Sequence, residues 1–179
     1  MVTYQDLLQN QSIKKIEKVE KEQYVFFHYE NYKIDINSAK QFLEQKNSKY
    51  AVIASYYAVL NITLWNLAKH FNLKISQKDT GVHTNCLIVL DELVKDKKVK
   101  NKILKLLKEA KEEFKSFTIL KKQTEKTLPV MLKHSSNKRK KYTYYSEENT
   151  KEKLNNINEA ENFLENTVMP YISIMEKLK

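Results

Sequence analysis

The scarcity of glycine and proline is what most constrains the fold of this chain. Gly81, Pro129 and Pro170 are the only such residues among 179, so few positions favour the tight turns on which β-hairpins depend. With 41% hydrophobic and 30% charged residues, the composition is typical of a helix-rich globular protein, and the length fits one domain with its own core. We therefore predict a mostly α-helical, single-domain protein.

The uncharged run from Tyr50 to Ala68 predicts a helix at the centre of the fold. Apolar residues cover most sides of a helix that begins at Lys49 and reaches Phe71, and such a helix belongs in a core or a membrane. Lipid would penalise the polar residues of this run, which are Ser55, Asn61, Thr63 and Asn66. A buried core helix is therefore the preferred interpretation over a membrane span.

The N-terminal region combines two different patterns. Apolar spacing from Tyr4 to Ile16, with Thr3 as the cap, predicts a helix that extends toward Lys21. From Gln23 to Ile36, aromatic and β-branched residues favour an extended arm or a short hairpin around Glu30–Asn31. Whether this arm packs on its own chain or on a partner stays open.

Four further helices are predicted from apolar spacing and capping residues. They run from Asn37 or Ser38 to about Gln45, from Val82 after the loop around Gly81 to Leu93, from Val99 through Phe117 toward Leu128, and from Asn149 or Thr150 to Met175. Pro129 is expected to stop the third of these helices, and Pro170 is expected to bend the last.

The net charge of +10 is spread unevenly along the chain. Lysines outnumber acids between Lys95 and Lys126, five basic residues and no acid lie between Lys133 and Lys141, and acids dominate from Glu147 to Glu165. Such a field favours a polyanionic partner such as nucleic acid, because lysines neutralise phosphates and release counterions. The alternative is a lysine-rich face that only keeps a helical protein soluble.

Arg139 is the only arginine beside 31 lysines. Because lysine supplies ordinary positive charge here, a lone guanidinium indicates bidentate recognition of a phosphate or a carboxylate. The tyrosines that follow it can stack on unpaired bases while lysines track the backbone. The alternatives are a chance surface arginine and tyrosines that pack on the last helix. The predicted RNA-binding residues are Lys138, Arg139, Lys140, Lys141, Tyr142, Tyr144 and Tyr145.

Signals for other chemistry are sparse. Cys86 is the single cysteine, which excludes an internal disulfide, and no signal peptide precedes Thr3, so we expect a cytoplasmic protein without a membrane anchor. His83 and Cys86 are three residues apart, but two ligands without helpers do not make a metal site, so we expect a core Cys86 and a loop His83. We expect no metal and no cofactor, since one glycine cannot form a glycine-rich phosphate loop.

The order of the segments resembles the HEPN family (higher eukaryotes and prokaryotes nucleotide-binding domain). The similar features are the helix around Ala54–Val59, the loop with Gly81-Val82-His83, a long amphipathic helix, the Arg139 turn that ends in tyrosines, and a final helix with Asn158–Leu164. The resemblance covers roughly Ser38 to Met175. It implies an up-and-down helical bundle over residues 37–179, with residues 1–36 as part of the same fold. It also implies a homodimer with a role in RNA metabolism or in conflict systems.

Many HEPN proteins are metal-independent endoribonucleases that use an arginine, four to six residues, and then a histidine. Arg139 matches the arginine, but Tyr144, Tyr145 and Ser146 occupy the three permitted histidine positions. A phenol with a pKa of about 10 is a poor acid or base at neutral pH. His134 precedes Arg139 and would reach the site only if the loop folds back. In toxin members a nucleotidyltransferase partner modifies a tyrosine two residues after the histidine, where this chain would have Ser146.

We therefore predict a non-catalytic, dimeric protein that binds RNA or a ribonucleoprotein. One alternative is a toxin-like endoribonuclease with an altered motif, in which Arg139 and possible helper His134 would be the catalytic residues. The other alternative is a subunit whose basic surface meets an acidic protein partner. Binding is favoured over catalysis, and the identity of the RNA stays open.

Overall fold

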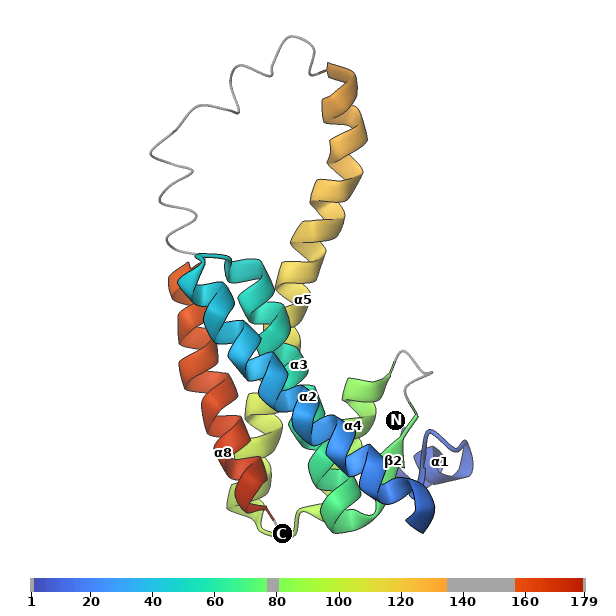
Figure 1. Cartoon of the computed structure of the whole chain (residues 1–179). Helices are drawn as coiled ribbons and strands as arrows, with labels where there is room; N and C mark the ends of the chain where they lie inside the picture. The colour runs from blue at the N-terminus through green and yellow to red at the C-terminus, as the bar shows by residue number, and fades with distance from the viewer. Residues whose placement is uncertain (1, 77–80, 135–156, 179) are drawn as a thin grey trace.

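The protein is an all-α helical bundle with one very small sheet, as predicted for the fold class (Figure 1). The computed structural model describes residues 2–76, 81–134 and 157–178, and side chains in these ranges except 116–134. Its elements are α1 (Tyr4–Gln9), β1 (Ile13–Lys15), α2 (Lys18–Glu44), α3 (Ser48–Phe71), β2 (Leu73–Ile75), α4 (Val82–Leu93), α5 (Lys97–His134), a helical stretch over 157–163, the π-helical turn η1 (Leu164–Val168) and α8 (Met169–Lys177).

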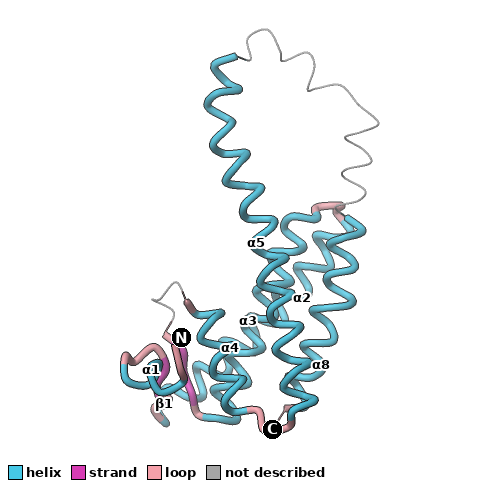
Figure 2. Tube along the Cα trace, turned by 180° about the vertical axis from the view of Figure 1, so that it is seen from behind, coloured by secondary structure: helices cyan, strands magenta, loops and turns pink. Residues whose placement is uncertain are grey.

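Helices α2, α3, the first half of α5 and α8 lie side by side and make the body of the bundle (Figures 1 and 2). The small elements α1, β1, β2 and α4 gather at the end of the bundle where α2 begins. The second half of α5 extends past the opposite end, beyond the ends of α2 and α3. One long helix thus links the core to the segment that carries Arg139.

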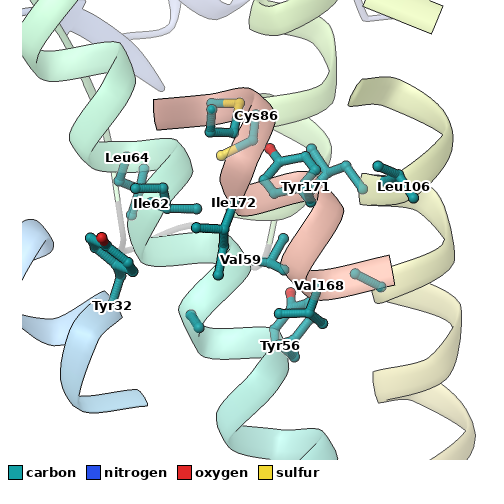
Figure 3. Packing of buried hydrophobic residues seen from close by; sticks show 14 of the residues in the cluster. Tyr32, Tyr56, Val59, Ile62, Leu64, Cys86, Leu106, Val168, Tyr171 and Ile172 are labelled. Atoms are coloured by element: carbon teal, nitrogen blue, oxygen red, sulfur yellow. The ribbon is translucent and has the colours of Figure 1, made fainter. Parts of the chain in front are cut away.

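Helix α3 is the centre of the fold, which confirms the predicted helix at Lys49–Phe71. It contacts α2, α4, α5, β2, η1 and α8. Figure 3 shows Val59 and Ile62 of α3 beside Val168 of η1 and Ile172 of α8. Asn72, with a left-handed φ of 55°, ends the helix. Among the described helices, α3 alone is long and apolar enough to cross a membrane. Other parts of the protein bury 78% of its most apolar window, a property that core helices of soluble proteins share.

The extended arm predicted between Gln23 and Ile36 is wrong, and so is a separate helix that starts at Asn37 or Ser38. Both segments belong to α2, which runs without interruption from Lys18 to Glu44. The helix buries His28, Tyr32, Ile36 and Ala39, which are spaced by four, four and three residues and therefore share one helical face. Burial of this face against α3 outweighs the local β propensity of the aromatic residues.

The N-terminal helix is real but shorter than predicted. Thr3 caps α1 as expected, in a reciprocal arrangement with Asp6. The helix ends at Gln9, and the left-handed φ of 59° at Gln11 turns the chain into β1. Strand β1 pairs antiparallel with β2 in the register Ile13↔Ile75, Lys14↔Lys74 and Lys15↔Leu73. The chain toward Lys21 therefore joins a sheet before α2 begins.

The predicted stop at Pro129 is wrong. Helix α5 continues through Pro129 to His134, although a proline inside a helix removes one backbone hydrogen bond and crowds the preceding turn. Near Pro170 the chain forms η1, in which the Met169 N–H donates to the carbonyl of Leu164, five residues back. This wide turn precedes the proline, where the regular hydrogen-bond ladder has to change. The predicted helix start at Asn149 or Thr150 lies outside the described residues.

Candidate nucleic-acid interface

The predicted RNA-binding segment lies outside the described residues. Between the end of α5 and residue 157 fall Lys138, Arg139, Lys140, Lys141, Tyr142, Tyr144 and Tyr145. His134 is the last residue of α5, and its side chain is likewise not described. The structure therefore bears on this segment through α5, the helix that leads into it.

Helix α5 carries a row of lysines on one side, which we call the lysine stripe: Lys97, Lys100, Lys108, Lys111 and Lys115. Their separations of three, four, seven or eight residues place them within one helical face, and Leu104 fills the gap in the row. At 1.5 Å per residue the stripe is about 27 Å long, enough to follow several phosphates of a nucleic-acid backbone. The same spacing recurs in the sequence at Lys122, Lys126 and Lys133.

The face of α5 next to the stripe anchors this helix to the core. Ile103, Leu107 and Ala110 are completely buried. The carboxylate of Asp96 accepts hydrogen bonds from the backbone N–H groups of Lys98 and Val99, which stabilises the start of the helix. Because this half of α5 is packed along its length, the lysines keep a fixed spacing.

Few acids neutralise the stripe. Lys100 lies 3.7 Å from Asp91 of α4, and Lys115 lies 3.0 Å from Glu112. Lys111 donates to the hydroxyl of Thr84 at 3.1 Å. Within the part of the chain that the structure describes, Lys97 and Lys108 form no ion pair. Because exposed ion pairs are weak, the stripe keeps a positive potential that an anionic partner can meet.

His83 is buried under this region, which corrects its expected position in a loop. It lies in the first turn of α4 and its Nδ1 is 3.2 Å from the hydroxyl of Tyr56. The Tyr56 ring in turn stacks on Phe114 of α5, with ring centres 4.1 Å apart. Burial, followed by the charges of Lys111 and Lys115, lowers the pKa of His83 to about 4. The imidazole is therefore a neutral part of the core at physiological pH.

The predicted core position of Cys86 is confirmed. Its thiol is free and fully buried, and burial raises its pKa to about 12. Such a thiol is protonated and unreactive at neutral pH. Across the described ranges no three His, Cys, Asp or Glu side chains gather in a way that could hold a metal ion.

A polar chain between α2 and α3 fixes the state of His28. The side-chain N–H of Asn61 donates to Asp35 at 2.8 Å, so the Asn61 carbonyl faces His28 and accepts from its Nδ1–H at 2.7 Å. Burial lowers the pKa of His28, and its ring is therefore neutral with an unprotonated Nε2. That buried nitrogen has no hydrogen-bond partner among the described residues.

His28 also lines a pocket of about 580 Å³ between the small sheet and α2. Its wall includes Lys14 of β1, Lys74 of β2, and Tyr24 and Phe27 of α2. None of these residues was predicted as a site from the sequence. Each of the two strands contributes a lysine that is visible in the sequence. Their pairing joins segments more than fifty residues apart, and no local sequence pattern indicates it.

Comparisons with known proteins gave no match. A scan against protein-family models found none, and neither did searches of the curated proteins and of the solved structures. The similarity to the HEPN family therefore stays a prediction from the order of motifs in the sequence.

Proposed function

We propose that the protein is an RNA-binding, HEPN-like helical protein that acts as a dimer and does not cleave RNA. The observation that carries this proposal is the lysine stripe on α5, a row of five lysines of which three form no ion pair among the described residues. The row runs toward the basic, tyrosine-rich segment around Arg139. Lysines that follow a phosphate backbone and tyrosines that stack on bases are a typical combination for single-stranded RNA.

The absence of a histidine after Arg139 supports binding over catalysis. Tyr144, Tyr145 and Ser146 stand where family nucleases place the histidine. A neutral phenol neither accepts the proton of a ribose hydroxyl nor donates one to a leaving oxygen at a useful rate near neutral pH. Arg139 would then bind phosphate without assisting its cleavage.

The outer face of α2 supports the proposed dimer. It consists of Val19, Phe26 and Ile34, whose exposed fractions are 92%, 68% and 58%. Large apolar side chains on one side of an exposed helix mark a contact surface. A second copy of the chain, placed with its α2 against this face, would bury them in a two-fold contact. In the partner-binding alternative, a different protein would bind to this face in place of a second copy of the chain.

The RNA proposal is tested with two double variants of equal charge. Lys97→Ala/Lys108→Ala removes the two lysines of the stripe that form neither an ion pair nor a side-chain hydrogen bond among the described residues. Lys98→Ala/Lys102→Ala removes two lysines from other sides of α5 that also form no ion pair among the described residues. Fluorescence anisotropy with a single-stranded RNA gives the affinity at several salt concentrations. The stripe variant should lower the slope of log affinity against log salt by roughly 1.4, since each lost phosphate contact contributes about 0.7.

The matched variant should leave that slope nearly unchanged. If both double variants weaken binding equally, only the net charge matters and the stripe is not the binding surface. A second test addresses the guanidinium: Arg139→Lys preserves charge but removes the bidentate contact, and should cost about 1 kcal/mol of RNA binding. Unchanged affinity in Arg139→Lys would show that this arginine is replaceable.

A further inference from the structure

The pocket between the sheet and α2 has features that the RNA-binding surface on α5 does not use. Its volume of about 580 Å³ lies within the range of small-molecule sites. It is lined by residues from β1, β2, α2 and the adjoining loops, including Ser76. The pocket shares no residue with the lysine stripe, so what binds there is a separate question.

Two lysines face this pocket from directly opposite positions on the sheet. Lys14 and Lys74 are cross-strand partners, and like charges at such positions destabilise a sheet unless an anion compensates them. The carboxylate of Glu20 lies 2.8 Å from the ammonium of Lys74. Lys14 is exposed and forms no ion pair within the described residues. One carboxylate for two lysines leaves a positive charge at the pocket for an anionic group.

Aromatic rings form the other side of the pocket. Phe27 is 57% exposed, although it lines the pocket and packs edge-on against His28 with ring centres 5.1 Å apart. Tyr24 also packs against His28, with ring centres 4.4 Å apart, and Lys74 is 5.3 Å from the centre of the Tyr24 ring. The exposed Phe27 ring is therefore a surface on which a flat heterocycle can stack.

His28 holds a buried hydrogen-bond acceptor behind this wall. Its Nε2 is unprotonated because Nδ1 holds the proton toward Asn61, and it has no partner among the described residues. A buried acceptor without a donor is costly. Because this nitrogen is buried, the accessible groups that a ligand can contact include the two lysines and Phe27.

We propose that this pocket binds a nucleoside phosphate, with the phosphate between Lys14 and Lys74 and the base on Phe27. The nucleotide can be free or can be the 5′-terminal nucleotide of an RNA, because both carry the same phosphate, sugar and base. Binding at this site goes beyond the proposed RNA-binding function of α5. It requires neither the stripe nor Arg139.

Calorimetric titration with AMP, adenosine and ribose 5-phosphate tests the proposal on the whole chain. AMP should bind saturably, and adenosine and ribose 5-phosphate should each bind at least about tenfold more weakly, since a charged hydrogen bond and a stacked base each contribute about that factor. Lys14→Ala and Phe27→Ala should each weaken AMP binding about tenfold for the same reasons. Both residues are exposed, so the fold should tolerate these changes.

The neighbouring lysine supplies a matched control. Lys15→Ala removes the same side chain as Lys14→Ala from an exposed position that does not line the pocket, and it should leave AMP binding unchanged. Equal losses in Lys14→Ala and Lys15→Ala, or equal binding of AMP and ribose 5-phosphate, would overturn the proposal.

A 5′-phosphorylated tetranucleotide compared with its 5′-hydroxyl form separates the two sources of the nucleotide. A preference for the phosphorylated RNA that Lys14→Ala abolishes, without binding of AMP, assigns the pocket to RNA ends. No binding of AMP and no preference between the two RNAs would refute the site. Lys97→Ala/Lys108→Ala should not affect AMP binding, which keeps a failure of the pocket distinct from a failure of the α5 surface.

Discussion

The buried contact between Thr63 and Tyr171 makes a directional prediction about stability. Both residues are completely buried, and their hydroxyl oxygens are 2.6 Å apart. Thr63 donates its only hydroxyl proton to the carbonyl of Val59 at 2.7 Å, so Tyr171 must be the donor to Thr63. This bond attaches the last helix to α3, together with the hydrogen bonds from Asn66 to the carbonyls of Met175 and Leu178.

The two single substitutions should therefore differ in cost. Thr63→Val leaves the Tyr171 hydroxyl buried without an acceptor, and should lower the free energy of unfolding by about 2 kcal/mol. Tyr171→Phe removes the donor while Thr63 keeps its bond to Val59, and should cost about 1 kcal/mol. The double variant has no unpaired hydroxyl, so it should be no less stable than Thr63→Val alone.

Urea unfolding followed by circular dichroism measures these differences in the free energy of unfolding. In a thermal unfolding experiment, 1 kcal/mol corresponds to a shift of about 2–4 °C in Tm for a chain of this size. Native helical content in all three variants serves as the control. If Thr63→Val costs no more than Tyr171→Phe, and the two effects add in the double variant, the direction of the hydrogen bond inferred from the structure is wrong.

Three further predictions concern the histidine of α4, the outer face of α2 and the altered motif. Because the pKa of His83 is lowered to about 4, the unfolded chain binds a proton at His83 below about pH 6.5 while the folded protein does not. The free energy of unfolding should then fall between about pH 6.5 and 4, by up to roughly 3 kcal/mol from this group, and denaturant titrations of His83→Gln should show a flatter profile. An equal pH dependence in that variant would contradict the lowered pKa. Light scattering should report a dimer at micromolar concentration. Phe26→Glu should dissociate this dimer, and Val2→Glu, a change at another exposed apolar site, should leave it intact. A monomer at every dilution would exclude the α2 contact. Purified protein should leave single-stranded RNA and transfer RNA intact over hours, whereas cleavage that Arg139→Ala abolishes would favour the endoribonuclease.

The bundle could be predicted from the sequence where one pattern dominates. In α3 no charged residue occurs from Tyr50 to Ala68, and in a helical protein this pattern predicts a central buried helix. The apolar residues spaced from Val99 to Phe114 likewise match the core-facing side of α5, where Ile103 and Leu107 are fully buried. In both helices the local periodicity and the tertiary burial agree.

Helix α2 shows why the same reasoning failed elsewhere. Its outer face carries Phe26 and Ile34 while its inner face carries Tyr32 and Ile36, so apolar residues occur on both sides and the helical period is hidden. Aromatic and β-branched residues in such a run favour an extended chain by local propensity. The deciding factor was packing against α3, which no local pattern reveals.

The sheet and its pocket depend on contacts between distant parts of the chain. Strand β1 has three residues, two of them lysines, and only its pairing with β2 gives it a structure. The opposed Lys14 and Lys74 become visible only once this register is known. The lysine stripe differs from the pocket because all its residues lie in one helix. Its spacing can be read from the sequence once the boundaries of α5 are known.

The salt dependence of RNA binding by the unmodified protein tests the central proposal most directly. Anisotropy titrations of a single-stranded RNA between about 50 and 200 mM salt give the slope of log affinity against log salt. Engagement of at least three phosphates by the stripe and the Arg139 segment predicts a slope of about −2 or steeper. A slope near zero, or no RNA binding at the lowest salt, would contradict an RNA-binding function and favour an acidic or apolar protein partner.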